Sequence, residues 1–424
     1  MNKFNKIFLA LICLSIAVAS IGFASASDIN DAYVTDSDFN DESLAVDDSI
    51  SGNDHKVIAK MELPRNYKNK KAELKKPEIE EEEKSVKVFD LKMEESTDGY
   101  DSSKESKTSG TFDDLQVEID NATAGSILHL YRDYNGNYGS RIQFHKDLTI
   151  DGHGHTLDCL YQGGCSAFYS SSGNITLKNL SIIHGHNDHT DKGGAIYITG
   201  SAQYTLINCS LIDNWADDYG GAIYNEVNKP LTLINCLLKG NTADDDSGGA
   251  VFSNGEVIIK NSILDNNRAW LDGGAVYCNK NVKVFNSSLT SNVAKGASSQ
   301  CYGGAICSKE DVVIENCTIS NNFAADYGGW VYAKNIYVNQ GQSLLSLFAG
   351  NTADDNDCGA LYAEETLKMS YADLNENKAY EDGGAVLCTN AYLDNCQFLS
   401  NHAEGSSFKQ CEGGAIFAKD DVHI

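Results

Sequence analysis

Two histidine-containing segments have residue types and spacings that could support chemistry. Gly152-His153-Gly154 places an imidazole between two turn-forming glycines. The segment from His184 to His189 reads His-Gly-His-Asn-Asp-His and spaces imidazole and carboxylate groups at intervals that suit zinc. Because no fourth fixed ligand accompanies it, an over-long loop that carries histidines is the simpler interpretation. We therefore assign no catalytic residue and no cofactor-binding residue to either segment.

A set of aspartates is the second candidate, because each stands one or two residues before a Gly-Gly pair. The set comprises Asp218, Asp246, Asp272, Asp326 and Asp382. If successive segments stack at the interstrand spacing of about 4.8 Å, these carboxylates form a column along one edge. Carboxylate oxygens are ligands that Ca²⁺ prefers, and its coordination is flexible. Bridging by Ca²⁺ is therefore our metal hypothesis, with side chains that splay into solvent as the simpler alternative.

The chain has thirteen cysteines, which raises the question of disulfides. Four of them share one slot, directly after a recurring asparagine: Cys209, Cys236, Cys317 and Cys396. Ser262 and Ser287 fill the same slot, so it selects a small side chain rather than a thiol. Stacked neighbours in this slot would have parallel Cβ vectors, which disfavours a bridge. Cys159 with Cys165 is the predicted local pair, and no cysteine is assigned a catalytic role.

The elements that must position these groups form an internal repeat. A Gly-Gly-Ala or Gly-Gly-Trp signature recurs about every 25 to 30 residues, with first glycines at Gly193, Gly220, Gly248, Gly273, Gly303, Gly328, Gly383 and Gly413. Cys358-Gly359-Ala360 fills the same slot. Between these signatures, asparagines recur in pairs six residues apart: Asn208 and Asn214, Asn235 and Asn241, Asn261 and Asn267, Asn286 and Asn292, Asn316 and Asn322, Asn395 and Asn401. We call these the first and the second asparagine of each unit.

Each unit has the pattern of short strands joined by bends. Val257 and Ile259 stand two residues apart, as Val282 and Val284 do on either side of Lys283 in the next unit, which predicts a strand with one buried face. Leu264 then stands at an odd offset, so the chain must bend near Asn261 for all three apolar side chains to face inward. Propeller blades need about 40 to 50 residues, so this unit is better explained as one coil of a parallel β-helix. The predicted fold is all-β, a solenoid of coils of about 25 to 30 residues.

The first asparagine of each unit has the same parity as the buried positions. We therefore predict that these amides point inward and form a stacked, hydrogen-bonded ladder. The alternative is that the first asparagines tolerate turn geometry on the surface.

The N-terminal quarter of the chain has a different composition from the repeat. Residues 1–26 combine a basic start, an apolar run and Ala24-Ser25-Ala26, which predicts a cleaved secretory signal peptide, with an uncleaved membrane anchor as the alternative. Residues 27–110 are highly charged and poor in apolar residues, which predicts a disordered spacer. Residues 111–424 are the predicted β-helix.

Both ends of the predicted β-helix have features of their own. The stretch from Thr111 to Asp120 predicts a short amphipathic helix, capped by Thr111 or Asp113, that covers the open edge of the first coil. At the other end the chain stops within a predicted strand, so we expect further coils beyond Ile424.

The charge balance excludes two classes of partner. The chain has 33 Lys and Arg residues against 60 Asp and Glu, a net charge of -27. Nucleic acids and anionic membrane surfaces both require a basic face. We therefore predict no nucleic-acid partner, and the mode of any membrane attachment is not predicted.

The repeat motifs resemble those of known surface proteins. Gly-Gly-Ala-Ile and Gly-Gly-Ala-Val tetrads, joined to motifs such as Leu211 to Asn214 and Phe398 to Asn401, resemble the polymorphic outer membrane protein repeat. The segment from Leu148 to Asp158 is similar to the opening coil of adhesin-like surface proteins of methanogenic archaea. The resemblance covers residues 111–424. It implies a right-handed parallel β-helix, the pectin lyase-like fold, in a protein of the cell envelope or cell outer membrane.

The resemblance also suggests a function. It implies a secreted cell-surface protein, adhesin-like or structural in the envelope, that has no active site. Its expected partners are a host or neighbouring cell surface, a carbohydrate or an envelope polymer. The alternative is a polysaccharide-degrading enzyme, a lyase or hydrolase, because Gly152-His153-Gly154 resembles a tripeptide of the pectin-hydrolysing family. Hydrolysis needs paired carboxylates at a set separation, and the sequence lacks that family's Asn-Thr-Asp and Arg-Ile-Lys motifs, so we predict that the chain is not an enzyme.

Overall fold

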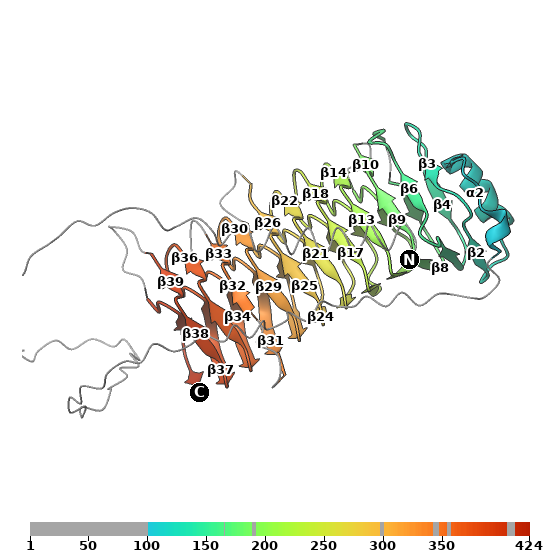
Figure 1. The fold of residues 1–424 in the computed structure, drawn as a ribbon. Helices are drawn as coiled ribbons and strands as arrows, with labels where there is room; N and C mark the ends of the chain where they lie inside the picture. The colour runs from blue at the N-terminus through green and yellow to red at the C-terminus, as the bar shows by residue number, and fades with distance from the viewer. Residues whose placement is uncertain are drawn as a thin grey trace, which may run out of the picture. The chain divides into compact units, whose positions relative to one another are not determined.

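The described part of this computed structural model is a stack of β-strands wound into a solenoid (Figure 1). It comprises residues 101–164, 166–188, 192–296, 301–341, 347–353, 358–404 and 412–424. The predicted signal peptide and most of the predicted spacer lie outside the described residues. No helix among the described residues is long and apolar enough to span a membrane.

One coil shows how the sequence forms each turn of the solenoid. It contains four short strands: β19 (Val251–Ser253), β20 (Val257–Lys260), β21 (Ile263–Asp265) and β22 (Arg268–Ala269). The inward-facing Val257, Ile259 and Leu264 are fully buried. β20 pairs in parallel with β24 (Val282–Phe285), which places Val257 opposite Val282 in the next coil. Equivalent residues of successive coils therefore lie side by side, and the core is a set of stacked apolar rows.

Two of the three sheets are built from one strand per coil. The 12-stranded sheet comprises β1 (Gly110–Thr111), β3 (Tyr134–Asn135), β6 (Thr156–Asp158), β9 (Ser181–Ile183), β13 (Ser210–Ile212), β17 (Leu237–Lys239), β21, β25 (Ser288–Thr290), β29 (Thr318–Ser320), β32 (Leu347–Ala349), β35 (Asp373–Asn375) and β38 (Gln397–Leu399). The 9-stranded sheet comprises β10 (His186–Asn187), β14 (Trp215–Ala216), β18 (Thr242–Ala243), β22, β26 (Val293–Ala294), β30 (Phe323–Ala324), β33 (Thr352–Ala353), β36 (Lys378–Ala379) and β39 (His402–Ala403).

The third sheet has 20 strands and combines two stacks. One stack contains β4 (Ile142–Phe144), β7 (Phe168–Ser170), β11 (Ile196–Ile198), β15 (Ile223–Asn225), β19, β23 (Val276–Cys278), β27 (Ile306–Ser308) and β40 (Ile416–Ala418). The other contains β2 (Ile127–His129), β5 (Leu148–Asp151), β8 (Asn174–Lys178), β12 (Gln203–Ile207), β16 (Leu231–Ile234), β20, β24, β28 (Asp311–Glu315) and β41 (Val422–His423).

In the late coils these two stacks merge into one broad sheet. β27 and β28 are separate strands, yet both pair with the single strand β31 (Val331–Asn339). β34 (Leu361–Ser370) and β37 (Val386–Asp394) continue this broad sheet. The late coils therefore present a longer row of outward-facing side chains than the early coils do.

A helix covers the first coil, as the sequence predicts. Apart from the short 3-10 helix η1 (Ser102–Lys104), the helix of the described region is α2 (Phe112–Asn121), at the N-terminal end of the stack (Figure 1). Thr111 is its N-cap, and a capping box joins the Thr111 and Asp114 side chains to each other's backbone N–H groups. The apolar face buries Phe112, Leu115 and Ile119.

The first asparagine of each coil lies at a bend. Asn261 and Asn286 adopt the left-handed backbone conformation, with φ of 48° and 47°. Asparagine enters this region more readily than most residues, which explains why it recurs there. The prediction of a buried first-position ladder is wrong about burial, because from Asn208 onward these side chains are half-exposed or exposed. Amide-to-amide bonds of 3.0 Å still join Asn179 to Asn208 and Asn208 to Asn235.

The second asparagine forms the buried ladder instead. The buried members are Asn214, Asn241, Asn267, Asn292, Asn322, Asn351 and Asn377. Asn267 accepts bonds from the backbone N–H and the Nδ2 of Asn241, at 3.1 and 2.9 Å. Its own Nδ2 donates to the carbonyl of Leu238 at 3.0 Å and to Oδ1 of Asn292 at 2.9 Å. Each buried amide is thereby satisfied by neighbouring coils.

The Gly-Gly pair marks a corner, and its second glycine, as at Gly274, has no room for a side chain. Gly273 has a φ of 64°. A Cβ added to Gly274 would lie 2.1 Å from the carbonyl oxygen of Gly304 in the next coil. Cys358 takes the first position of one pair with a φ of 71°. The first position of the pair, unlike the second, therefore tolerates a side chain.

Candidate functional site

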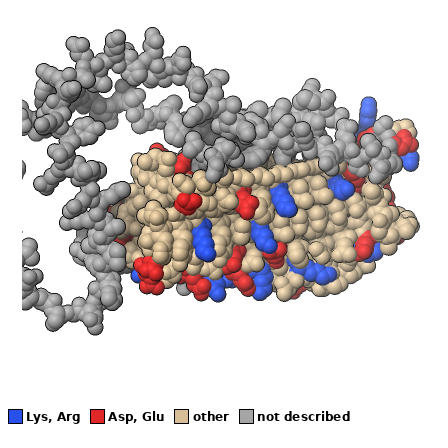
Figure 2. Space-filling view, turned by 90° about the horizontal axis from the view of Figure 1, so that it is seen from below, with Lys and Arg blue, Asp and Glu red and all other residues tan. Residues whose placement is uncertain are grey.

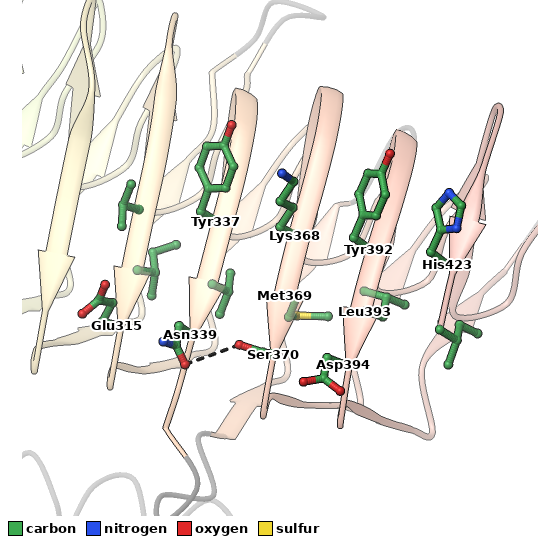
Figure 3. Close-up of a pocket in the computed structure, with 14 residues that line it drawn as sticks. Glu315, Tyr337, Asn339, Lys368, Met369, Ser370, Tyr392, Leu393, Asp394 and His423 are labelled. Carbon is green, nitrogen blue, oxygen red and sulfur yellow. Dashed lines mark hydrogen bonds between the residues drawn. The ribbon is translucent and has the colours of Figure 1, made fainter.

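A row of aromatic and basic side chains crosses the outer face of the late coils (Figure 3). These side chains lie opposite one another in register, one per coil: Tyr337, Lys368, Tyr392 and His423. A second row runs beside it: Glu315, Asn339, Ser370 and Asp394. The two rows line a groove together with the buried residues Val338, Met369 and Leu393, which lie between them along the strands.

The groove offers flat rings beside hydrogen-bonding groups. The rings of Tyr392 and His423 are stacked, with centroids 4.8 Å apart and an interplanar angle of 10°. Lys368 Nζ lies 5.6 Å from the centre of the Tyr392 ring, and Ser370 Oγ donates to Asn339 Oδ1 at 3.4 Å. Tyr392 is 41% exposed. Such a surface can stack against the apolar face of a planar or ring-shaped ligand and bond its polar edge.

The acidic groups of the groove are poorly placed for hydrolysis. Glu315 and Asp394 stand three coils apart in the second row. At the interstrand spacing this separation is about 14 Å. Glycoside hydrolysis needs two carboxyl groups about 5 to 9.5 Å apart. This pair is therefore too widely separated for the two-carboxylate mechanism of glycoside hydrolysis.

A longer aromatic row follows the early coils, with basic side chains beside some of its rings. Neighbouring rings have centroids 4.8 to 5.4 Å apart: Tyr169, Tyr197, Tyr224, Phe252 and Tyr277. The first two pairs meet edge to face and the last two are stacked. The Arg141 guanidinium lies 4.4 Å from the Tyr169 ring, and Lys192 Nζ lies 5.0 Å from the Tyr224 ring, as Lys368 lies beside Tyr392 in the groove. On the face shown in Figure 2, acidic and basic side chains are interspersed and do not gather into one patch.

Hydrogen bonds hold several members of the predicted acidic column. Asp272 and Asp382 accept the backbone N–H of Tyr302 and Glu412 in the following coil, at 2.9 and 2.6 Å. The buried Asp326 accepts the backbone N–H of Cys301 at 2.8 Å. The remaining two members, Asp218 and Asp246, flank Tyr219, whose pKa is raised to about 12, first by burial and then by its hydrogen bond to Asp246. Calcium binding by this column stays a prediction.

Asp272 is a member of the column with a perturbed acidity. Burial raises the pKa of its carboxyl group to about 6, although the Tyr302 N–H and Lys309 act in the opposite direction. The nearby charges of Asp246 and Asp326 raise it further. The column therefore contains at least one carboxylate whose ionised form is costly in the folded protein.

His153, the histidine of the Gly-His-Gly tripeptide, belongs to a cluster of side chains that the sequence did not reveal. His129 Nδ1 lies 2.8 Å from His153 Nε2, and His153 Nε2 lies 3.6 Å from Asp151 Oδ1. Within the described ranges, these three side chains form the one group of His, Cys, Asp or Glu whose ligand atoms all lie within 4.8 Å of one another. Burial lowers the pKa of His153 more than Asp151 raises it. His129 lies opposite Asp151 in paired strands. The sequence could not show this pairing, because the first coils lack the Gly-Gly signature that sets the register of the later coils.

The other histidine segment does not assemble in the same way. His184 Nδ1 lies 2.9 Å from Asp158 Oδ1, whereas the His186 ring stacks on Trp215 with centroids 4.2 Å apart. His189 lies outside the described residues. His184 and His186 thus contact different neighbours. His186 lies in strand β10, which pairs with β14, so the interpretation of this segment as a loop is wrong for His186.

Three cysteines of the repeated slot, Cys209, Cys236 and Cys317, are buried thiols, and Cys396 is half-buried. Cys209 and Cys236 occupy successive coils as free cysteines, as the parallel Cβ vectors predict. Their Sγ atoms donate to backbone carbonyls, including those of Leu177 and Leu206. Burial raises the pKa of Cys236 to about 12, which suppresses the reactive thiolate. The predicted partner of Cys159, Cys165, lies outside the described residues.

The geometry and the comparisons with known proteins identify the architecture. Residues 135–304 match a family model described as a right handed beta helix region. The fold is a right-handed parallel β-helix. No curated protein and no solved structure matches the chain. The predicted fold class is therefore confirmed, while the choice between an adhesin-like protein and a polysaccharide-degrading enzyme is left open, because right-handed β-helices serve both.

Proposed function

We propose that this β-helix is a secreted cell-surface protein, adhesin-like or structural in the envelope, that binds an extended carbohydrate polymer without cleaving it. The single observation that carries the proposal is the groove with its row of Tyr337, Lys368, Tyr392 and His423. The row advances by one coil per residue and so follows the solenoid axis. An extended polymer can contact several of these side chains at once, and multiple weak contacts then add up.

The composition of the groove narrows the class of polymer. Lys368 and His423 stand opposite the second row, which contains Glu315 and Asp394, so the groove has no single sign of charge. The whole chain has a net charge of -27 and repels polyanions at a distance. A neutral polysaccharide, which stacks on tyrosine and bonds to amide, hydroxyl and carboxylate groups, is therefore the favoured ligand.

A glycan array with the full chain tests the proposal. Wild-type protein should bind a neutral glycan, and Tyr392→Ala and Tyr337→Ala should each weaken binding about fivefold or more, the loss of roughly 1 kcal/mol of ring stacking. Tyr138→Ala is the matched control, because Tyr138 is 72% exposed and does not line the groove. Equal losses in all three variants, or no glycan binding by the wild type, would remove the proposal.

The enzymatic alternative has its own measurement. A uronate-release assay on acidic polysaccharides, run with the same protein, should show no turnover. Product release that depends on Lys368 would replace the binding proposal by a lyase. Localisation is tested separately, by asking whether residues 1–26 direct export and are cleaved after Ala26.

A further inference from the structure

We propose that His129, Asp151 and His153 bind one divalent transition-metal ion, with Zn²⁺ as the ion of first choice. The three side chains come from the first coils, next to helix α2 and distant in sequence from the groove. The proposal is independent of the carbohydrate-binding function.

The fold brings the three ligands together from two coils. β2 and β5 pair in parallel with His129 opposite Asp151. His153 follows β5 by two residues, at a corner where its backbone takes a φ of 46°. Gly152 allows the chain to pass this corner, because a Cβ there would lie 2.7 Å from the carbonyl oxygen of Asn179. The ligand positions are therefore fixed by strand pairing and by one tight turn.

The distances are close to those of a tetrahedral site. Zinc binds imidazole nitrogen and carboxylate oxygen at about 2.0 to 2.2 Å, so neighbouring ligand atoms lie about 3.3 Å apart in a tetrahedron. His153 Nε2 and Asp151 Oδ1 are 3.6 Å apart. His129 Nδ1 and His153 Nε2 are 2.8 Å apart. The ligand atoms of all three side chains lie within 4.8 Å of one another, so small movements of the imidazoles would bring them to a shared ion.

Asp151 gives an independent reason to expect a cation. The residue is fully buried. Its Oδ1 accepts the Nδ2 of Asn179 at 2.9 Å and the backbone N–H of His153 at 3.3 Å. Its Oδ2 is also buried and has no hydrogen-bond partner in the structure. A buried carboxylate oxygen without a partner is costly, and a cation held by this carboxylate would offset that cost.

The donor set decides which class of ion fits. Two imidazoles and one carboxylate suit Zn²⁺ and its transition-metal neighbours, whereas Ca²⁺ and Mg²⁺ prefer oxygen donors. The hydrogen bond from Asn179 to Asp151 orients the carboxylate, as groups that hydrogen-bond to the metal ligands do in zinc sites. Three protein ligands leave a fourth position for water or an external ligand.

The test is equilibrium binding of Zn²⁺ to the full chain, with Co²⁺ as a spectroscopic probe of coordination. We expect one site with a tetrahedral or five-coordinate Co²⁺ spectrum and a rise in melting temperature. Asp151→Asn and His129→Gln should each weaken binding of Zn²⁺ at least tenfold. The matched control is His145→Gln, because His145 is exposed and lies outside the cluster.

The Asp151→Asn variant also separates metal binding from folding. The new amide oxygen still accepts the Asn179 bond, so the metal-free variant should melt at or above the wild-type temperature. Equal Zn²⁺ affinity in wild type and Asp151→Asn would overturn the proposal and point to adventitious surface histidines. An equal response to Ca²⁺ would overturn the assignment of the ion class.

Discussion

Asn267 shows how one buried side chain can tie three coils together. Its amide bonds to Asn241 and Leu238 in the preceding coil and to Asn292 in the following one. Both donor hydrogens and the acceptor oxygen are used, so the amide has little desolvation cost. Replacing one atom in this chain of hydrogen bonds should therefore lower the stability of the fold.

Asn267→Asp should destabilise the protein by about 2–4 kcal/mol at neutral pH, because an oxygen would face the acceptors on Leu238 and Asn292 in a buried site. Urea denaturation followed by circular dichroism measures this loss. Asn261→Asp is the matched control: this first asparagine is half-exposed at a left-handed bend, which aspartate also tolerates, so we expect less than about 1 kcal/mol. Equal losses in the two variants would contradict the assignment of the ladder.

The sequence revealed both asparagines but could not decide which one is buried. Side chains alternate between inward and outward directions along a strand only while the backbone stays extended. The left-handed residue at Asn261 breaks the alternation, and a second one at Asn266 precedes Asn267 and turns that side chain inward. Counting from Val257 and Ile259 therefore gave the wrong asparagine, although it gave the right apolar core.

The carboxyl group of Asp272 should make the stability of the protein depend on pH. Its pKa is raised from 3.8 to about 6 by burial, so below about pH 3 the group is neutral in both folded and unfolded protein. As pH rises from about 3 to 6 the unfolded chain loses this proton more readily, and the folded state loses stability, by up to about 3 kcal/mol. Asp272→Asn should thus be more stable than wild type at pH 7, and the difference should disappear by about pH 3. A difference between the two proteins that does not change with pH would contradict this raised pKa.

Helix α2 is the element that closes the first coil. The sequence predicted its position, with Thr111 or Asp113 as the cap, because capping residue types and apolar spacing are local signals. The structure assigns the cap to Thr111. Its packing partners could not be predicted, since they belong to coils without the Gly-Gly signature. An uncovered first coil would expose unpaired strand edges.

Leu115→Asp should detach α2 and promote self-association. Leu115 is fully buried against the first coil, so a carboxylate there should free the helix and leave the strand edge open to another chain. Size-exclusion chromatography with light scattering measures the change. Val117→Asp is the control on the opposite face of the same helix, where Val117 is 59% exposed. A monomeric Leu115→Asp protein with native stability would show that the helix does not protect this edge.

For the whole molecule, the sequence predicts the fold but does not predict the groove. Inward positions repeat in every coil because each must fill the same slot of a continuous core. Outward positions such as Tyr337, Lys368 and Tyr392 share only their register, so no pattern of residue type marks them. The His129 cluster was missed for a related reason: its ligands meet through pairing of strands, and pairing is a property of the stack.

A solenoid in which coils contact only their neighbours should survive the loss of a whole coil and not of half a coil. Deleting residues 248–272 removes one coil and brings Asn241 to bond with Asn292, as Asn241 and Asn267 do now. The shortened chain should stay folded and monomeric, with a β-sheet circular dichroism spectrum and a somewhat lower melting temperature. Deleting residues 248–260 instead would place apolar rows against turns and should give an unfolded or aggregated protein. If both deletions abolish folding, the coils depend on long-range contacts and the nearest-neighbour description is wrong.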